Sequence, residues 1–360
     1  MASLSEIKEL KVLFLNTFLM PPGMSPHKTI HKDARLHYLC DNIIGDYDIL
    51  LFCEVFNLHF MAKAVGCFGL MPSFHRQHTL IQRARDKGFK YHCTQTGISL
   101  PHITDGGLII LSRFPIDETD SMIFSDSGPG YERFMAKGVL YAQIGGIDLF
   151  VSHLQSDQIS VSESSIGSGE EIRKKQIVEM KKFISKYAKS DRLCLLAADM
   201  NIDATVKLDD NIVVEKEEYK NMIAELGAID LFYATHDYFP VTYGARLEDG
   251  RPMATDLTCQ DEIGACETLD YFLRIDHKYS IPGLLDYGTS DGEYEYHDEV
   301  TKSMVMGWII KNINIEKFQT PMEDFSQISD HFGISFTLKR PFEFIDNGGE
   351  SGSYWFELAL

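Results

Sequence analysis

Residues 138–153 read Gly-Val-Leu-Tyr-Ala-Gln-Ile-Gly-Gly-Ile-Asp-Leu-Phe-Val-Ser-His, which is two apolar segments joined by a short turn at Gly145-Gly146. A Gly-containing turn of this length is typical of an antiparallel β-hairpin. Parallel neighbours would need a long crossover connection instead. The hairpin therefore argues against a purely parallel, doubly wound sheet.

Further short apolar segments bounded by turn residues predict more strands along the chain. Together with 138–144 and 147–153, they are 11–17, 48–54, 107–112, 193–199, 269–275 and 332–338. Helical spacing predicts helices at 34–44, 170–189 and 217–226. This alternation predicts an α/β fold, a four-layer sandwich of two mixed, mostly antiparallel sheets flanked by helices.

The chain has 360 residues, enough for one large domain or two ordinary ones. We expect one large domain at 1–345 and a flexible Gly- and Ser-rich tail at 346–360. The Ser- and Gly-rich segment 155–171 and the acidic segment 286–299 predict loops. The aromatic run 354–356 in the tail is either a docking anchor or an edge strand on the same core.

Acidic residues dominate the charge, with 53 Asp and Glu against 34 Lys and Arg and a formal charge of −19. Such a field repels nucleic acid unless a local basic groove overrides it. The one basic cluster is expected at solvated helix positions. It comprises Arg76, Arg83, Arg85, Lys87 and Lys90.

The apolar runs are far shorter than the roughly 20 residues that span a bilayer, so we expect no transmembrane segment. The charged N-terminus shows no signal-peptide pattern, and a cytoplasmic location is the default. The seven cysteines form no CxxC pair and are expected mostly as buried thiols. In an oxidising compartment, Cys259 and Cys266 are the pair that would form a disulfide.

Polar residues recur at the ends of the apolar segments, and strand ends of a sheet converge on one edge. These residues are Asn16, Glu54, His153, Asp199 with Asn201, Asp270, and Asp330 with His331. Each alone is explained as a cap or turn residue. Together they predict one pocket.

The residue types suit phosphate chemistry. The Glu54 carboxylate with the amide oxygen of Asn16 is an oxygen platform for Mg²⁺. Two histidines and a further carboxylate supply acid–base groups, each typically worth about 10²- to 10⁴-fold in rate. The chain has no HExxH, Gly-x-Ser-x-Gly or P-loop pattern, which disfavours zinc-protease, acyl-enzyme and nucleotide-hydrolase chemistry.

An ordered series of motifs resembles the endonuclease/exonuclease/phosphatase superfamily, and within it the Mg²⁺-dependent neutral sphingomyelinases of bacterial type. The motifs are Leu15-Asn16-Thr17, Glu54-Val55-Phe56, Asp105-Gly106-Gly107, Lys137-Gly138, His153-Leu154-Gln155, Asp199-Met200-Asn201, Leu269-Asp270-Tyr271 and Ser329-Asp330-His331. The resemblance spans about 11–338, which makes 1–345 the catalytic domain. It implies a two-sheet sandwich that hydrolyses sphingomyelin to ceramide and phosphocholine at a membrane surface.

The resemblance also implies roles for individual residues. Glu54 would bind Mg²⁺, or alternatively Mn²⁺ or Co²⁺, with Asn16 beside it. Asp199 and Asn201 would orient water and phosphate, with Lys137 as a further substrate contact. His331 would be the general base, although superfamily members differ over whether it or Asp199 takes the proton. Asp270 would fix the His331 tautomer, Asp330 joins the catalytic set, and His153 would stabilise the transition state or protonate the leaving oxygen.

Two departures from the family and three alternatives stay open. Only Asp157 remains of an acidic pair that follows the His-Leu-Gln block, which makes it a doubtful second metal contributor. The run 304–310 around Trp308 is either a lipid-inserting segment or core, and core is the commoner outcome. The alternatives are a nuclease or deadenylase, an inositol-phosphate phosphatase, and a catalytically silent binding module.

Overall fold

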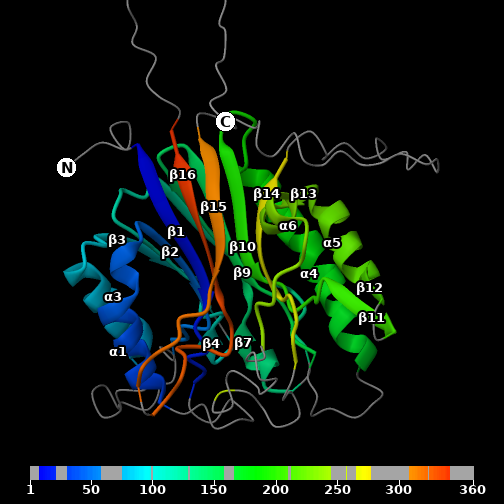
Figure 1. The fold of residues 1–360 in the computed structure, drawn as a ribbon, viewed down its shortest axis with the longest axis horizontal. Coiled ribbons are helices and arrows are strands. Elements are labelled where there is room, and N and C mark those ends of the chain that lie inside the picture. The colour runs from blue at the N-terminus through cyan, green and yellow to red at the C-terminus, as the bar shows by residue number, and fades with distance from the viewer. Residues whose placement is uncertain are drawn as a thin grey trace, which may run out of the picture.

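The computed structural model describes residues 8–21, 31–57, 75–98, 100–128, 130–157, 166–209, 212–244, 257, 265–276, 308–322 and 324–340. Two six-stranded sheets pack face to face at the centre, and helices lie outside both (Figure 1). This is the predicted four-layer α/β sandwich.

The first sheet contains both ends of the described chain. Its strand order is β15 (Ile309–Glu316), β16 (Gly333–Lys339), β1 (Glu9–Asn16), β2 (Ile49–Cys53), β5 (Ile109–Ser112) and β3 (Tyr91–Thr94). Only β1 and β2 pair in parallel, in a register that sets Asn16 opposite Cys53. Both of these strands therefore end at the same edge of the sheet.

The second sheet is built around the predicted hairpin. Its order is β13 (Ala228–Asp230), β14 (Asp270–Ile275), β10 (Leu193–Asp199), β9 (Ile147–His153), β8 (Gly138–Ile144) and β6 (Glu118–Ile123). Strands β8 and β9 pair antiparallel, as predicted, while β9 and β10 are parallel. The register sets Asp199 opposite His153 on one side and Asp270 on the other.

The core explains why these strands are apolar along their whole length. In β10, Leu193, Leu195 and Ala197 pack between the two sheets. The alternate residues of β10 pack against α4 (Ile166–Tyr187) and α5 (Glu217–Leu226). Helices α1 (Lys32–Asn42) and α3 (Arg76–Asp86) cover the outer face of the first sheet. Because both faces of the central strands are buried, their side chains do not alternate between apolar and polar.

Several elements have too little apolar patterning for their bounds to be predicted. Strand β6 reads Glu-Thr-Asp-Ser-Met-Ile and lies at a sheet edge, where polar side chains are tolerated. Helix α3 is strongly polar as well. The smaller elements are β4 (Thr104–Asp105), β7 (Met135–Ala136), β11 (Thr205–Asp209), β12 (Ile212–Glu215), α6 (Leu231–His236) and the 3-10 turns η2 (Ile44–Asp46) and η4 (Glu132–Phe134).

The structure corrects two expectations. Helix α4 begins at Ile166, inside the segment 155–171 predicted as a loop. Gly169 allows a close approach there, because a Cβ at this position would lie 2.0 Å from the Asp157 carboxylate. Arg76 is buried, not solvated, and is paired with Asp33 at 2.7 Å, whereas Arg85 is exposed as expected.

The predictions of a loop at 286–299, of a flexible tail at 346–360 and of a Cys259–Cys266 disulfide involve residues outside the described part of the chain. Four cysteines are buried thiols as predicted, namely Cys40, Cys53, Cys93 and Cys194, while Cys266 is exposed. Trp308 is 2% exposed, which agrees with the core interpretation; residues 304–307 lie outside the described part. Within the described part of the chain, we find no helix with the length and apolarity to cross a bilayer.

Candidate active site

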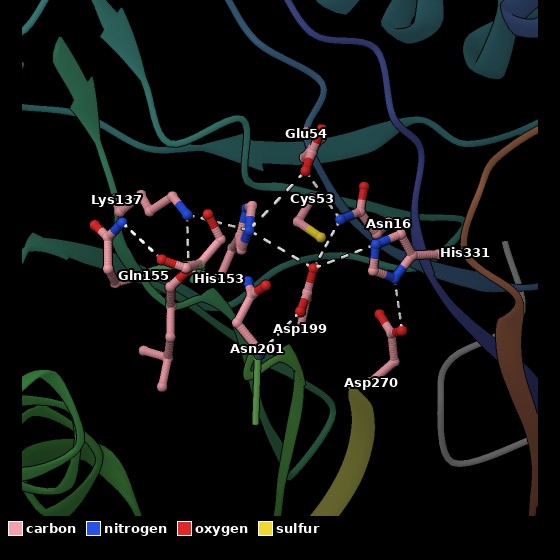
Figure 2. Close-up of polar contacts among 12 residues, drawn as sticks. Asn16, Cys53, Glu54, Lys137, His153, Gln155, Asp199, Asn201, Asp270 and His331 are labelled. Atoms are coloured by element: carbon pink, nitrogen blue, oxygen red, sulfur yellow. Dashed lines mark hydrogen bonds and ion pairs between the residues drawn. The ribbon is translucent and has the colours of Figure 1, made fainter. Parts of the chain in front are cut away.

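The predicted polar residues meet where the central strands end (Figure 2). Asn16 ends β1 and Glu54 follows β2 in the first sheet, while His153 ends β9 and Asp199 ends β10 in the second. A hydrogen bond of 2.8 Å from Asn16 Nδ2 to Asp199 Oδ2 joins the two sheets at this point. The sandwich therefore brings together residues 183 positions apart in the sequence.

Asp199 lies at the centre of the group. Its Oδ2 is 3.6 Å from His153 Nε2 and 3.8 Å from His331 Nε2. Its Oδ1 accepts a hydrogen bond of 3.0 Å from the Asn201 backbone N–H. Burial alone would raise the pKa of Asp199, but the two histidines and the Asn16 amide outweigh burial and lower it. The group at the centre is thus a stabilised carboxylate.

Glu54 presents a buried oxygen with no hydrogen-bond partner. Its backbone is left-handed, with φ of 59°, and its side chain turns toward Asn16 and His153. Oε1 accepts from Asn16 Nδ2 at 3.1 Å, whereas Oε2 has no partner among the described residues. Burial and the nearby Asp330 raise the pKa of Glu54 to about 7. An unpaired buried carboxylate oxygen of this kind fits a bound cation.

Asn16 lies beside Glu54 as predicted, but its amide faces the carboxylates through nitrogen. The nitrogen donates to both Glu54 and Asp199, while the oxygen accepts the Phe18 backbone N–H at 3.0 Å. Asn16 therefore holds the two carboxylates in place in this arrangement, while the Phe18 N–H uses one of the two lone pairs of its oxygen.

His331 and Asp270 form a short contact between two titratable groups of the site. His331 Nδ1 lies 2.7 Å from Asp270 Oδ2, and the opposite nitrogen faces Asp199. Burial alone would lower the pKa of His331, but Asp270 and Asp199 raise it well above its ordinary value. Thr242, a residue that the sequence did not single out, anchors Asp270 by accepting its backbone N–H at 3.0 Å.

Lys137 lies against His153 from the other side. Its Nζ is 3.3 Å from His153 Nε2, 2.7 Å from Glu132 Oε1 and 2.7 Å from the Leu154 carbonyl. Burial and the Lys137 charge lower the pKa of His153 to about 3, so this histidine is neutral near pH 7. Glu132 was missed by sequence reasoning because it lies on a short turn, η4, with no apolar pattern around it.

The donor set fits a hard divalent cation. Asp199 is the shared member of two clusters with donor atoms within 4.8 Å of one another, one with Asp270 and His331 and one with Cys53 and His153. Burial raises the pKa of the Cys53 thiol well above its ordinary value, so it stays protonated and is a poor ligand. The oxygen donors available to a cation among the described residues are therefore the carboxylates of Glu54, Asp199 and Asp270.

Of the other predicted residues, Asn201 and Asp330 lie next to the site, whereas Asp157 is paired with an arginine. Asn201 has a left-handed backbone with φ of 51° and donates to the Leu154 carbonyl at 3.2 Å. Asp330 is buried next to the site and accepts from the Ser329 hydroxyl at 3.3 Å. Asp157, in contrast, is held by a bidentate pair with Arg173 at 2.8 and 3.2 Å. The Asp157 carboxylate therefore already has a positively charged partner and does not need a metal ion to be stabilised.

Comparison with solved structures shows which fold the chain has. No family model matches the chain. Among solved structures, beta toxin from Staphylococcus aureus superposes with a TM-score of 0.59 over 91% of this chain and 99% of that one, at 17% identity. A beta toxin variant with bound magnesium ions gives 0.58 at 17% identity, over 91% and 99%. An endonuclease/exonuclease/phosphatase protein from Beutenbergia cavernae gives 0.52 at 14% identity, over 93% of this chain and 72% of that one. The chain has the endonuclease/exonuclease/phosphatase fold.

Within that fold, the sequence is similar to sphingomyelinases. A sphingomyelinase of Dictyostelium discoideum is 24% identical over 83% of this chain and 73% of its own length. Sphingomyelinase C of Bacillus cereus is 26% identical over 65% of this chain and 68% of its own. Sphingomyelinase C 2 of Leptospira interrogans is 25% identical over 67% of this chain, but the match spans only 36% of that protein.

Proposed function

We propose that this chain is a divalent-metal-dependent phosphodiesterase that hydrolyses sphingomyelin to ceramide and phosphocholine, with 1–345 as its catalytic domain. One observation carries the proposal. Asp199, two histidines and the unpaired Glu54 oxygen lie around one point where both sheets end. The similarity to sphingomyelinases supports this substrate among the phosphodiesters.

His331 is the proposed general base. Asp270 lies on its Nδ1 side at 2.7 Å, so Nδ1 carries the proton and Nε2 is left to accept one from water. Nε2 faces Asp199, which is the other candidate for taking that proton. In either case Asp199 and Asn201 hold the water and the phosphate in line for attack.

His153 and Lys137 form the proposed positive side of the site. Because Lys137 Nζ has only N–H donors, a neutral His153 accepts from it through Nε2, and the buried Lys137 charge lies 3.3 Å from this nitrogen. Negative charge that develops on the phosphorane would be stabilised by this pair. Because Lys137 is already paired with Glu132, we propose that it acts on phosphate chiefly through His153.

Mg²⁺ is the proposed metal, with Mn²⁺ or Co²⁺ as substitutes, held by the unpartnered oxygen of Glu54 and by Asp199, the residue shared by the two clusters of donor atoms. When bound, the ion neutralises charge on the phosphoryl oxygens and so lowers the barrier to attack. Asn16 keeps the two carboxylates apart and oriented toward one point.

The proposed substrate lies at a membrane surface, with the protein acting peripherally. A net charge of −19 is compatible with zwitterionic phosphocholine head groups and repels polyanions. We therefore expect binding to neutral vesicles and weak binding to strongly anionic ones.

A direct test is phosphocholine release from sphingomyelin vesicles with Mg²⁺ and with EDTA. We expect release with Mg²⁺, none with EDTA, and none from His331→Ala protein that keeps its native circular dichroism spectrum. More than a tenth of the activity in His331→Ala would contradict the assignment of the base. A Glu54→Ala protein purified in parallel is the control for a contaminating phosphodiesterase, because a contaminant would release phosphocholine in that preparation as well.

A nuclease is the alternative with a specific observation behind it. A D. rerio protein crystallised with a single-strand DNA product has the same fold, with a TM-score of 0.56 at 15% identity over 92% of this chain and 99% of that one. Cleavage of DNA or RNA without any phosphocholine release would favour this alternative. The acidic charge of the chain speaks against it.

A further inference from the structure

Helix α3 carries a buried amide, Gln77, that reaches the segment following Glu54. Gln77 is 4% exposed. Its Nε2 donates to the Val55 carbonyl at 2.9 Å and to Asp105 Oδ2 at 2.9 Å. A side-chain amide nitrogen has two N–H donors, and both are used here. Methionine has the same length but no donor, and glutamate has no donor when ionised.

The backbone that Gln77 contacts is strained at Glu54. A non-glycine residue with φ of 59° is uncommon and costs of order 1–3 kcal/mol, so surrounding contacts must hold it. On one side, the Val55 N–H donates to the Gly107 carbonyl at 3.0 Å. Gly107 is packed so closely that a Cβ there would lie 2.9 Å from Glu54 Cα. On the other side, the Val55 carbonyl is held by Gln77.

Asp105 extends this contact into a closed set of hydrogen bonds. Its Oδ1 accepts the Asn57 N–H at 2.9 Å and the Gly107 N–H at 3.1 Å. The Gln77 amide then connects Asp105 back to Val55. The turn that carries Glu54 is thus tied through the Val55 N–H, the Val55 carbonyl and the Asn57 N–H, and Gln77 joins this set from helix α3.

The hydrogen bonds of Gln77 are not what attaches α3 to the sheet. Leu80 and Ala84 are fully buried and join the core between α3 and the first sheet. The Gln77 bonds instead go to the loop after β2 and to β4, which flank the Glu54 turn. Their direct effect is therefore on where the Glu54 backbone lies.

We propose that Gln77 is a positioning residue that sets the direction of the Glu54 carboxylate for the metal. The inference rests on the proposed function, since it takes Glu54 as a metal ligand. Residues that orient a ligand from outside typically affect metal affinity by about 10- to 100-fold. Gln77 should act in this way, through the Val55 carbonyl, without touching metal or substrate.

The test is Mn²⁺ binding to the full chain, measured by the electron paramagnetic resonance signal of free Mn²⁺ and without any substrate. Gln77→Met should weaken Mn²⁺ binding by about 10- to 100-fold. Gln82→Met is the matched control, because Gln82 is an exposed glutamine on the same helix; its Mn²⁺ affinity should equal that of the unaltered protein. At saturating metal, turnover by Gln77→Met should return toward the unaltered value, which a general loss of structure would not allow.

A second variant, Gln77→Asn, keeps both donors on a side chain one methylene shorter and should also weaken Mn²⁺ binding. If Glu54→Ala weakens Mn²⁺ binding but both Gln77 variants bind as the unaltered protein does, the inference is overturned alone. If the unaltered protein binds no Mn²⁺, or Glu54→Ala binds it equally well, the proposed metal site is overturned and the inference with it. A lower melting temperature of Gln77→Met with unchanged Mn²⁺ affinity would also overturn the inference.

Discussion

Replacing Asp270 by asparagine tests how the site holds His331. The change keeps the size of the side chain and removes the charge 2.7 Å from His331 Nδ1. A hydrogen bond to a charged group contributes about 1.5–3 kcal/mol, which corresponds to about 10- to 100-fold in rate if it is lost in the transition state. We therefore expect kcat/KM of Asp270→Asn to fall by about that factor.

The same substitution should move the pH profile in a defined direction. Asp270 helps to raise the pKa of His331, and a general base must be unprotonated to act. Without the Asp270 charge the pKa of His331 falls, so the acidic limb of kcat/KM should shift to lower pH while the maximum drops.

The assay uses a water-soluble phosphocholine diester with saturating Mg²⁺, which separates the chemistry from membrane binding. Asp276→Asn is the matched control, because Asp276 follows the far end of β14. Unchanged kcat/KM and an unchanged acidic limb in Asp270→Asn would refute the assignment of His331 as the base oriented by Asp270.

Three further predictions follow from the buried charges. Because Glu54 is a proposed direct ligand, Glu54→Ala should weaken Mg²⁺ affinity by more than the about 10- to 100-fold that is typical for a residue orienting a ligand from outside, measured by calorimetric titration; equal affinity would remove Glu54 from the metal site. Lys137→Met removes the cation paired with the buried Glu132 carboxylate, which keeps only its hydrogen bonds from Gln155 and Ser156. It should lower the free energy of unfolding by about 3–5 kcal/mol in urea titrations, and adding Glu132→Gln should restore most of it. Burial raises the pKa of Asp230 to about 6, above its unfolded value, so its carboxyl favours folding below about pH 4 and that contribution is lost as pH rises through 6. Relative to the unaltered protein, Asp230→Asn should gain up to about 3 kcal/mol between pH 4 and pH 7; equal pH dependence of the two proteins would contradict this.

Strands with continuous apolar sequence were predicted well. Strands β8, β9 and β10, and helix α5, lie at the predicted residues. Each is bounded by turn residues and buries apolar side chains, so its limits are visible locally. The edge strand β6 was missed and the bounds of the polar helix α3 were not predicted, because both elements are held in place by neighbours and not by an apolar pattern of their own.

The site was predicted as a set of residues but not as a set of contacts. Asn16 was expected to offer its oxygen to the metal, and the contact of that oxygen with the Phe18 N–H was not predicted. Lys137 was expected as a substrate contact, and its pairing with Glu132 was not predicted. Each of these partners is settled by short loops whose conformations depend on packing.

The sequence by itself determined which chemical groups the protein has available and that they follow apolar strands, since strand burial and turn chemistry are local properties. Only the tertiary structure decided that Asn16 meets Asp199 across two sheets and that Gln77 reaches the Glu54 turn. Such contacts depend on strand register and on the packing of one sheet against the other. Register and packing bring together residues that are distant in sequence, and no local pattern encodes such contacts.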